Sequence, residues 1–120
     1  MNVIHLLGRI GDDPATKTLD SGATVTEFSL ATSERWTDKQ GNKQEKTEWH
    51  RVVFWGKGGE ILAKHLSKGD PVQITGSMIY EKWQDKDGNN RTTAKVKAQN
   101  FEFVPSSGTR EVKASDPVTN

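Results

Sequence analysis

Cysteine is absent from these 120 residues, and so is any long apolar run. The first absence excludes disulfides, thiolate nucleophiles and Cys-based zinc or iron–sulfur sites, and it is typical of a reducing compartment. No apolar stretch approaches the roughly 18 residues that a membrane-spanning helix needs. The first residues have neither the basic region of a signal peptide nor a transit-peptide pattern. We therefore expect a cytoplasmic protein with no membrane partner.

An excess of charge of one sign is also lacking. The 17 basic and 16 acidic side chains leave a net charge of +1 and a pI of about 8.0. Because net charge governs solubility and steering, any nucleic-acid site has to be a local basic face. Only 32% of the residues are apolar, so a single domain with a small core is expected. Four Trp in so polar a chain therefore stand out.

Signatures of catalysis and of metal binding are missing as well. His5, His50 and His65 lie far apart in the sequence, so we expect no metal and no cofactor. Residues 85–89 (DKDGN) differ from a calcium loop, because Gly stands at position 4 instead of 6 and no Glu stands at position 12. Residues 56–59 (GKGG) lack the full phosphate-loop pattern, and no G-x-S-x-G elbow occurs. We expect a protein that is not an enzyme.

Strand patterns dominate what is present. β-rich stretches bounded by turn clusters predict five strands, at residues 3–10, 24–32, 47–55, 71–83 and 91–103. The polar residues 37–46, with Gly-Asn at their centre, predict a long hairpin tip, and residues 85–90 predict a turn. Residues 60–66 form the one good helical stretch. No internal repeat is apparent.

These elements predict an all-β fold with one short helix. Gly76 lies in the middle of a long strand, where Gly is typical of a bend at a barrel corner. Five strands, one helix and this Gly favour a five-stranded Greek-key OB-fold barrel with long β-hairpins. The barrel domain is expected at residues 1–104. Residues 105–120 lack periodicity and are expected to form a flexible C-terminal tail.

The third predicted strand has an unusual face. Alternation places one set of side chains together, namely Trp49, Arg51, Val53 and Trp55, and the opposite set is Glu48, His50, Val52 and Phe54. Two large aromatic rings beside a cation are unusual for a core and typical of a binding surface. Trp36 and Trp83 stand at the bases of the two predicted hairpins, also beside charged residues. Every base has a π-face, so such Trp suit a single strand of any sequence. The alternative is that they pack in the core or at its rim.

Basic side chains near the Trp are candidate phosphate contacts. They include Arg51, Lys57 and Lys82, with Lys68 and the row formed by Arg91, Lys95 and Lys97. The alternative for each Lys is an ordinary solvated strand face.

Two other functions fit the sequence less well. An OB-fold accessory protein that binds other proteins would not need four dispersed exposed Trp, and a nuclease would need a carboxylate or His cluster that the sequence lacks.

The sequence resembles the bacterial-type single-stranded DNA-binding protein family over about residues 3–104. The carrying strings are VIHLLGRIGDDP, FSLATSERWTDK, TEWHRVVFWGK, HLSKGDPVQITG and KWQDKDGNNRTTAKV. The resemblance implies an OB-fold homotetramer, associated with the nucleoid, that protects single-stranded DNA during replication, recombination and repair. It implies base stacking on Trp36, Trp49, Trp55 and Trp83, and phosphate contacts from Arg51, Lys57, Lys82, Lys39 and Lys68. It also implies that His50 lies at a subunit interface.

One departure from that family concerns the end of the chain. Members usually end in a Gly/Gln/Pro-rich linker and a short acidic tip that finishes in Phe and docks partner proteins. This sequence ends in SDPVTN, with one acidic residue and no aromatic one. Recruitment of replication and repair proteins is therefore left open, whereas the expected DNA-binding barrel is unaffected.

Overall fold

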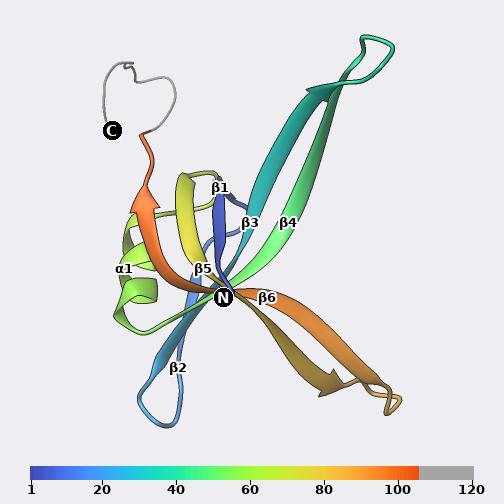
Figure 1. Ribbon diagram of the computed structural model, residues 1–120. Helices are drawn as coiled ribbons and strands as arrows, with labels where there is room; N and C mark the ends of the chain where they lie inside the picture. The colour runs from blue at the N-terminus through green and yellow to red at the C-terminus, as the bar shows by residue number, and fades with distance from the viewer. Residues whose placement is uncertain (106–120) are drawn as a thin grey trace.

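The computed structural model describes residues 1–105. Within them the chain forms six strands and one helix (Figure 1), which are β1 (Ile4–Ile10), β2 (Ala15–Thr18), β3 (Thr24–Thr37), β4 (Lys43–Trp55), α1 (Lys57–His65), β5 (Pro71–Gln84) and β6 (Asn90–Phe103). None of the helical structure in this part of the chain is long and apolar enough to cross a membrane. The tail expected at residues 105–120 lies, apart from Pro105, outside the described residues.

Five of the strands close into a barrel. The sheet order is β1-β5-β6-β4-β3-β2, and a further pairing of β1 with β3 joins its two sides. That closing contact matches Arg9 with Ala31 and Ile10 with Leu30. The β4–β6 pair is parallel and short, whereas the other pairs are antiparallel. A closed Greek-key barrel with one helix confirms the predicted fold class.

The core lies inside this barrel. Its fully buried large side chains include Phe28 and Leu30 from β3 and Val52 from β4. Leu62 of α1 and Leu66, which directly follows the helix, belong to the same cluster. Alternation along β4 therefore places its core face as predicted, since Val52 and Phe54 are buried there. One residue departs from the pattern, because Val53 is buried although it lies on the opposite face and outside the core cluster.

The structure differs from the sequence prediction at β2 and at the start of α1. Strand β2 was not predicted, because its residues ATKT are all exposed and it is defined by pairing with β3 alone. Helix α1 begins at Lys57 instead of residue 60. Gly58 and Gly59 therefore lie inside the helix. Both positions require glycine, because a Cβ on Gly58 would come within 2.6 Å of the Phe54 ring and one on Gly59 would collide with the Phe54 carbonyl. The helix thus needs both glycines to pack this close to β4.

Half of the polar stretch at residues 37–46 is strand, so the tip is shorter than predicted. Strand β3 continues to Thr37 and β4 begins at Lys43, so the connection is residues 38–42. Beyond the barrel this hairpin has no buried face, and so its sequence shows no apolar alternation. We call residues 33–47 the first arm and residues 80–94, the outer part of the β5–β6 hairpin, the second arm. Figure 1 shows the two arms leaving the barrel in diverging directions, away from α1.

Candidate nucleic-acid interface

All four Trp are at the surface. Relative exposure is 66% for Trp49, 48% for Trp36, 49% for Trp83 and 46% for Trp55, and none belongs to the core cluster. Trp36 and Trp83 lie on the first and second arms, and the other two lie on the outer face of β4. The structure therefore contradicts the alternative in which these rings fill the core.

Trp49 is positioned by a glycine on a neighbouring segment. It pairs with Ala31 of β3, and the Gly11 amide donates a 2.8 Å hydrogen bond to the Ser29 carbonyl on the same strand. A Cβ on Gly11 would lie 2.5 Å from Cζ3 of Trp49. The indole therefore lies directly against the Gly11 backbone, which no larger residue allows without moving the ring.

Arg51, a predicted phosphate contact, is already held between two carboxylates. One guanidinium nitrogen lies 3.3 Å from Oε1 of Glu27 and the other 3.6 Å from Oδ2 of Asp12. Asp12 also accepts hydrogen bonds from the Ser29 amide (2.7 Å) and hydroxyl (3.0 Å). The hydrogen bond from the Ser29 amide, with help from Arg51, holds the pKa of Asp12 below its ordinary value, although burial acts in the opposite direction. The Arg51 charge is thus largely offset in the unliganded protein.

The row predicted on β6 is only partly available. Lys95 makes a 2.8 Å ion pair with Glu81, and its side chain is 17% exposed. Lys97, two residues along the same face, is exposed. Lys95 therefore lies in a packed cross-strand pair and is a weaker candidate for phosphate contact than Lys97.

The remaining predicted cations are dispersed. Lys57 begins α1, on the side of the barrel away from the arms (Figure 1), and Lys68 lies in the loop that follows the helix. The Lys68 amide donates a 2.8 Å hydrogen bond to Asp13 Oδ1, which ties this loop to the turn after Gly11. Lys82 stands beside Trp83, and Lys39 lies in the tip of the first arm. The structure therefore brings Lys82 and Lys39 to the Trp-bearing arms and places Lys57 elsewhere.

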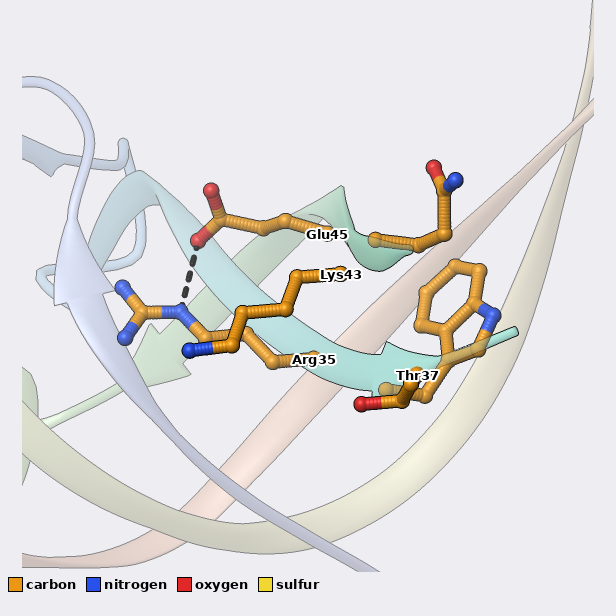
Figure 2. Close-up of a pocket in the computed structure, with 6 residues that line it drawn as sticks. Arg35, Thr37, Lys43 and Glu45 are labelled. Carbon is orange, nitrogen blue, oxygen red and sulfur yellow. Dashed lines mark hydrogen bonds and ion pairs between the residues drawn. The ribbon is translucent and has the colours of Figure 1, made fainter. Parts of the chain in front are cut away.

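The first arm contains a pocket beside its Trp. It measures about 480 Å³ and is lined by Arg35, Trp36, Thr37, Lys43, Gln44 and Glu45. Figure 2 shows the Arg35 and Lys43 side chains alongside one another, with the 3.0 Å ion pair from Arg35 to Glu45. Lys43 was not predicted as a site residue, because it stands seven residues from Trp36 in the sequence. Cross-strand pairing of Thr37 with Lys43 brings it there.

The second arm contains a similar pocket. It measures about 440 Å³ and is lined by Lys82, Trp83, Gln84, Asn90, Arg91 and Thr92. The Trp83 indole N–H donates a 2.8 Å hydrogen bond to the Thr93 hydroxyl, which fixes the ring. Arg91 is directed by a 3.0 Å ion pair to Asp85. This pocket therefore combines an oriented ring with the cations Lys82 and Arg91.

Both arm tips are closed by an Asp side chain. Asp38 and Asp85 each accept backbone hydrogen bonds through Oδ1, from residues 40 and 42 and from residues 87 and 89, at 2.8–2.9 Å. The bonds from Asn42 and Asn89 are the largest cause that holds the pKa of each carboxyl below its ordinary 3.8. The ionised carboxylate is thus the form that closes each tip.

Acid should open both tips. Because the pKa of each Asp is lowered in the folded state, the tip hydrogen bonds contribute their full stability at and above the ordinary Asp pKa. They weaken as the pH falls through the lower folded-state pKa, below about pH 4. The NMR amide shifts of Gln40, Asn42 and Asn89 should report this loss. Asp38→Asn keeps an oxygen acceptor and should remove the titration at the first tip only. Amide shifts that titrate near neutral pH would contradict this assignment.

His50 faces the interior side of β4 and is half-buried. Its Nε2 lies 2.8 Å from the Thr32 hydroxyl on the paired strand. This cross-strand bond is compatible with the expected interface role but does not test it, so that role stays a prediction. Among residues 1–105, no three His, Asp or Glu side chains gather as a metal site would require.

A closed OB-fold barrel with exposed Trp on β4 and on two arms defines a protein of the nucleic-acid-binding OB class. Solved structures agree on this fold. The chain matches a Plasmodium falciparum SSB solved in complex with ssDNA, with a TM-score of 0.79, 32% identity, and 88% of this chain and 96% of that one covered. It also matches a single-stranded DNA binding protein from Thermus aquaticus, with a TM-score of 0.78, 26% identity, and 90% and 52% covered.

Sequence comparison gives the family. The model of the single-strand binding protein family matches residues 1–104, and the chain belongs to this family. Similar curated proteins, each named single-stranded DNA-binding protein, come from Xanthomonas campestris (40% identity, 90% of this chain, 63% of that protein) and Xanthomonas axonopodis (40%, 90%, 60%). A third, single-stranded DNA-binding protein 1 of Xylella fastidiosa, is 39% identical over 87% of this chain and 77% of its own length. The chain thus spans less than two thirds of the two Xanthomonas proteins.

Proposed function

We propose that this chain binds single-stranded DNA without base preference and protects it during replication, recombination and repair, with no enzymatic step. The observation that carries the proposal is the set of four exposed Trp on β4 and on the two arms. Trp is costly to leave in water, and several exposed rings beside cations are the arrangement that successive bases need for stacking. The family membership supports the same ligand.

The proposed mechanism combines stacking with phosphate contacts. Bases stack on Trp36, Trp49, Trp55 and Trp83, while Lys39, Lys82 and Lys97 follow the backbone, with weaker contributions from Lys57, Lys68 and Lys95. Arg51 contacts a phosphate only by exchanging the carboxylates that now hold it. Because the lost ion pairs offset part of the gain from the phosphate contact, Arg51 adds less to affinity than an unpaired cation does.

Self-association is part of this proposal. Val3, just before β1, is 54% exposed, and Leu7, on β1, is 62% exposed. Exposed apolar side chains of this kind favour contact with a second copy. We propose a homo-oligomer, specifically the homotetramer that the family resemblance implies, with His50 at a subunit interface. The expected cytoplasmic, nucleoid-associated location follows from this ligand and stays part of the proposal. Docking of replication or repair proteins through the chain end concerns residues outside those described.

Titration of intrinsic Trp fluorescence with oligo-dT tests the proposal. Quenching is expected because bases stack on exposed indoles, and log Kobs should fall linearly with log salt by about 0.7 per phosphate contact. A duplex of the same length is the matched competitor and should compete poorly. Unchanged fluorescence, or equal competition by duplex, would remove the stacking model and favour a surface that binds proteins.

Replacing Gly11 by Ala should weaken this binding through Trp49. The new methyl group would lie where the indole now packs, so the ring must move, at a cost of up to about 1–3 kcal/mol of stacking. The measurement is the affinity for oligo-dT of Gly11→Ala, Trp49→Ala and the double variant. If Gly11 acts through the Trp49 ring, Gly11→Ala should cause no further loss of affinity in the Trp49→Ala background. An equal loss in both backgrounds would show that Gly11 acts independently of Trp49.

A further inference from the structure

The two arms carry the same short sequence. Residues 36–42 read WTDKQGN and residues 83–89 read WQDKDGN, so five of seven positions are identical. No repeat is visible at the level of whole strands, because the identity is confined to the tip and its Trp. In both copies the Trp stands on the outgoing strand, three residues before a Lys of the connection.

The two copies fold alike. In each tip the Asp carboxylate accepts the amides two and four residues later, and the Asp amide donates to the Asn carbonyl (2.8 Å in the first tip, 3.0 Å in the second). Gly41 and Gly88 both have φ of 84°, in the left-handed region that favours glycine. The second carboxylate oxygen also holds equivalent side chains, Gln44 at 3.1 Å and Arg91 at 3.0 Å.

The pockets correspond residue by residue as well. Each is lined by the Trp, its two chain neighbours and three consecutive residues on the returning strand, and the volumes are about 480 and 440 Å³. Strand register explains the match, since Trp36 pairs with Gln44 and Trp83 pairs with Arg91. Each arm thus places an exposed indole, a pocket and a tip Lys at the same relative positions.

The tip lysines complete the equivalence. Lys39 and Lys86 are both exposed, and within residues 1–105 neither makes an ion pair. The family resemblance implies a phosphate contact from Lys39 but none from Lys86, which stands between Asp85 and Asp87 in a mixed-charge run. Asp85 is occupied by the tip amides and Arg91, so it does not pair with Lys86.

We propose that the two arms are copies of one strand-binding module, in which the Trp holds a base and the tip Lys contacts the adjoining backbone, and that Lys86 is therefore a DNA contact equal to Lys39. The inference rests on the proposed function and adds a residue and an equivalence to it. Phosphate is the only strongly anionic group of a single strand, and an unpaired ammonium is the group that binds it as a point charge.

The test compares Lys39→Gln and Lys86→Gln, made separately in the full chain. Binding of fluorescein-labelled oligo-dT is followed by anisotropy at several salt concentrations. Each variant removes one phosphate contact from every arm of its kind that is bound to the strand. The slope of log Kobs against log salt should therefore fall by about 0.7 for each such arm, and the affinity losses of the two variants should agree within about twofold. Lys64→Gln is the matched control, because Lys64 is an exposed Lys on α1, away from the arms.

A tip exchange tests the equivalence directly. Replacing residues 37–44 (TDKQGNKQ) by the second-arm sequence QDKDGNNR should leave affinity for oligo-dT within about twofold of wild type. The module model is overturned if Lys86→Gln behaves like Lys64→Gln while Lys39→Gln lowers the slope. It is also overturned if the exchanged chain keeps its thermal melting temperature but loses more than about tenfold in affinity. Failure of the proposed function is a different result, in which wild-type protein itself does not bind oligo-dT.

Discussion

Alanine at both Trp36 and Trp83 is expected to weaken binding of single-stranded DNA by about 2–6 kcal/mol, since each stacked base contributes about 1–3 kcal/mol. Both rings are about half exposed and stand beside pockets that have no other aromatic lining residue. Neither pocket can replace its ring, so the loss should not be rescued by neighbouring side chains. Anisotropy of labelled oligo-dT is the appropriate measurement, because the variant loses two of its four fluorophores.

The control for this variant is Phe103→Ala. Phe103 is an exposed aromatic residue at the end of β6, packed edge-on against His65 and Phe101 and outside both arms. The Phe103→Ala variant should bind oligo-dT with wild-type affinity. Because neither arm ring belongs to the core cluster or to the side chains packed against it, the double Trp variant should also keep its unfolding free energy within about 0.5 kcal/mol. Wild-type affinity in the double variant would exclude base stacking on the arms.

The β4 strand shows how far period-two reasoning reaches. Alternation separated Trp49 and Trp55 from Val52 and Phe54, and the cation beside the two rings indicated that the Trp set faces outward. The same rule fails on the arms. There neither face is buried, so the polar residues 43–46 look like loop although backbone pairing makes them strand. Hydrogen bonding between backbones leaves no signature in side-chain polarity.

Ion pairs between residues far apart in the chain could not be predicted from the sequence, for a different reason. Arg51 looked like a free cation, but barrel closure brings Asp12 beside it and strand pairing adds Glu27. Nothing in the neighbourhood of Arg51 in the chain indicates either partner. Lys95 is similar, since the β5–β6 pairing supplies Glu81. Charged residues can therefore be recognised as candidates from sequence, whereas their availability depends on register between strands.

The repeated tips represent an intermediate case. Their identity is printed in the sequence, yet Trp, Asp, Lys, Gly and Asn are separated by variable residues and surrounded by other polar ones. Asp-x-x-Gly-Asn is also ordinary turn chemistry, which by itself predicts a hairpin and nothing more. The repeat acquires meaning only when the two pockets are seen to have corresponding linings. Local sequence therefore defined each turn, and the comparison of two folded arms defined the module.

Phe28→Ala is expected to lower the free energy of unfolding by about 3–5 kcal/mol. Phe28 has no exposed surface and lies in the core cluster with Leu30 and Val52, so truncation leaves a cavity inside a closed barrel. Strands that pair on both sides cannot move in to fill it. A small domain has about 5–15 kcal/mol in total, so this single change removes a large part of its stability. Urea denaturation at fixed protein concentration measures it.

Phe103→Ala again provides the matched control, since the same atoms are removed from an exposed site where no cavity forms. Its cost should stay below about 1 kcal/mol. The pair also separates stability from binding. Phe28 lies in a core cluster that includes no Trp, so whatever fraction of Phe28→Ala remains folded should bind oligo-dT with near wild-type affinity. The double Trp variant, in contrast, should be folded and bind weakly. If Phe28→Ala unfolded no more easily than Phe103→Ala, the barrel interior could not be the main source of stability, and the arms would lose the rigid base on which their equivalent placement depends.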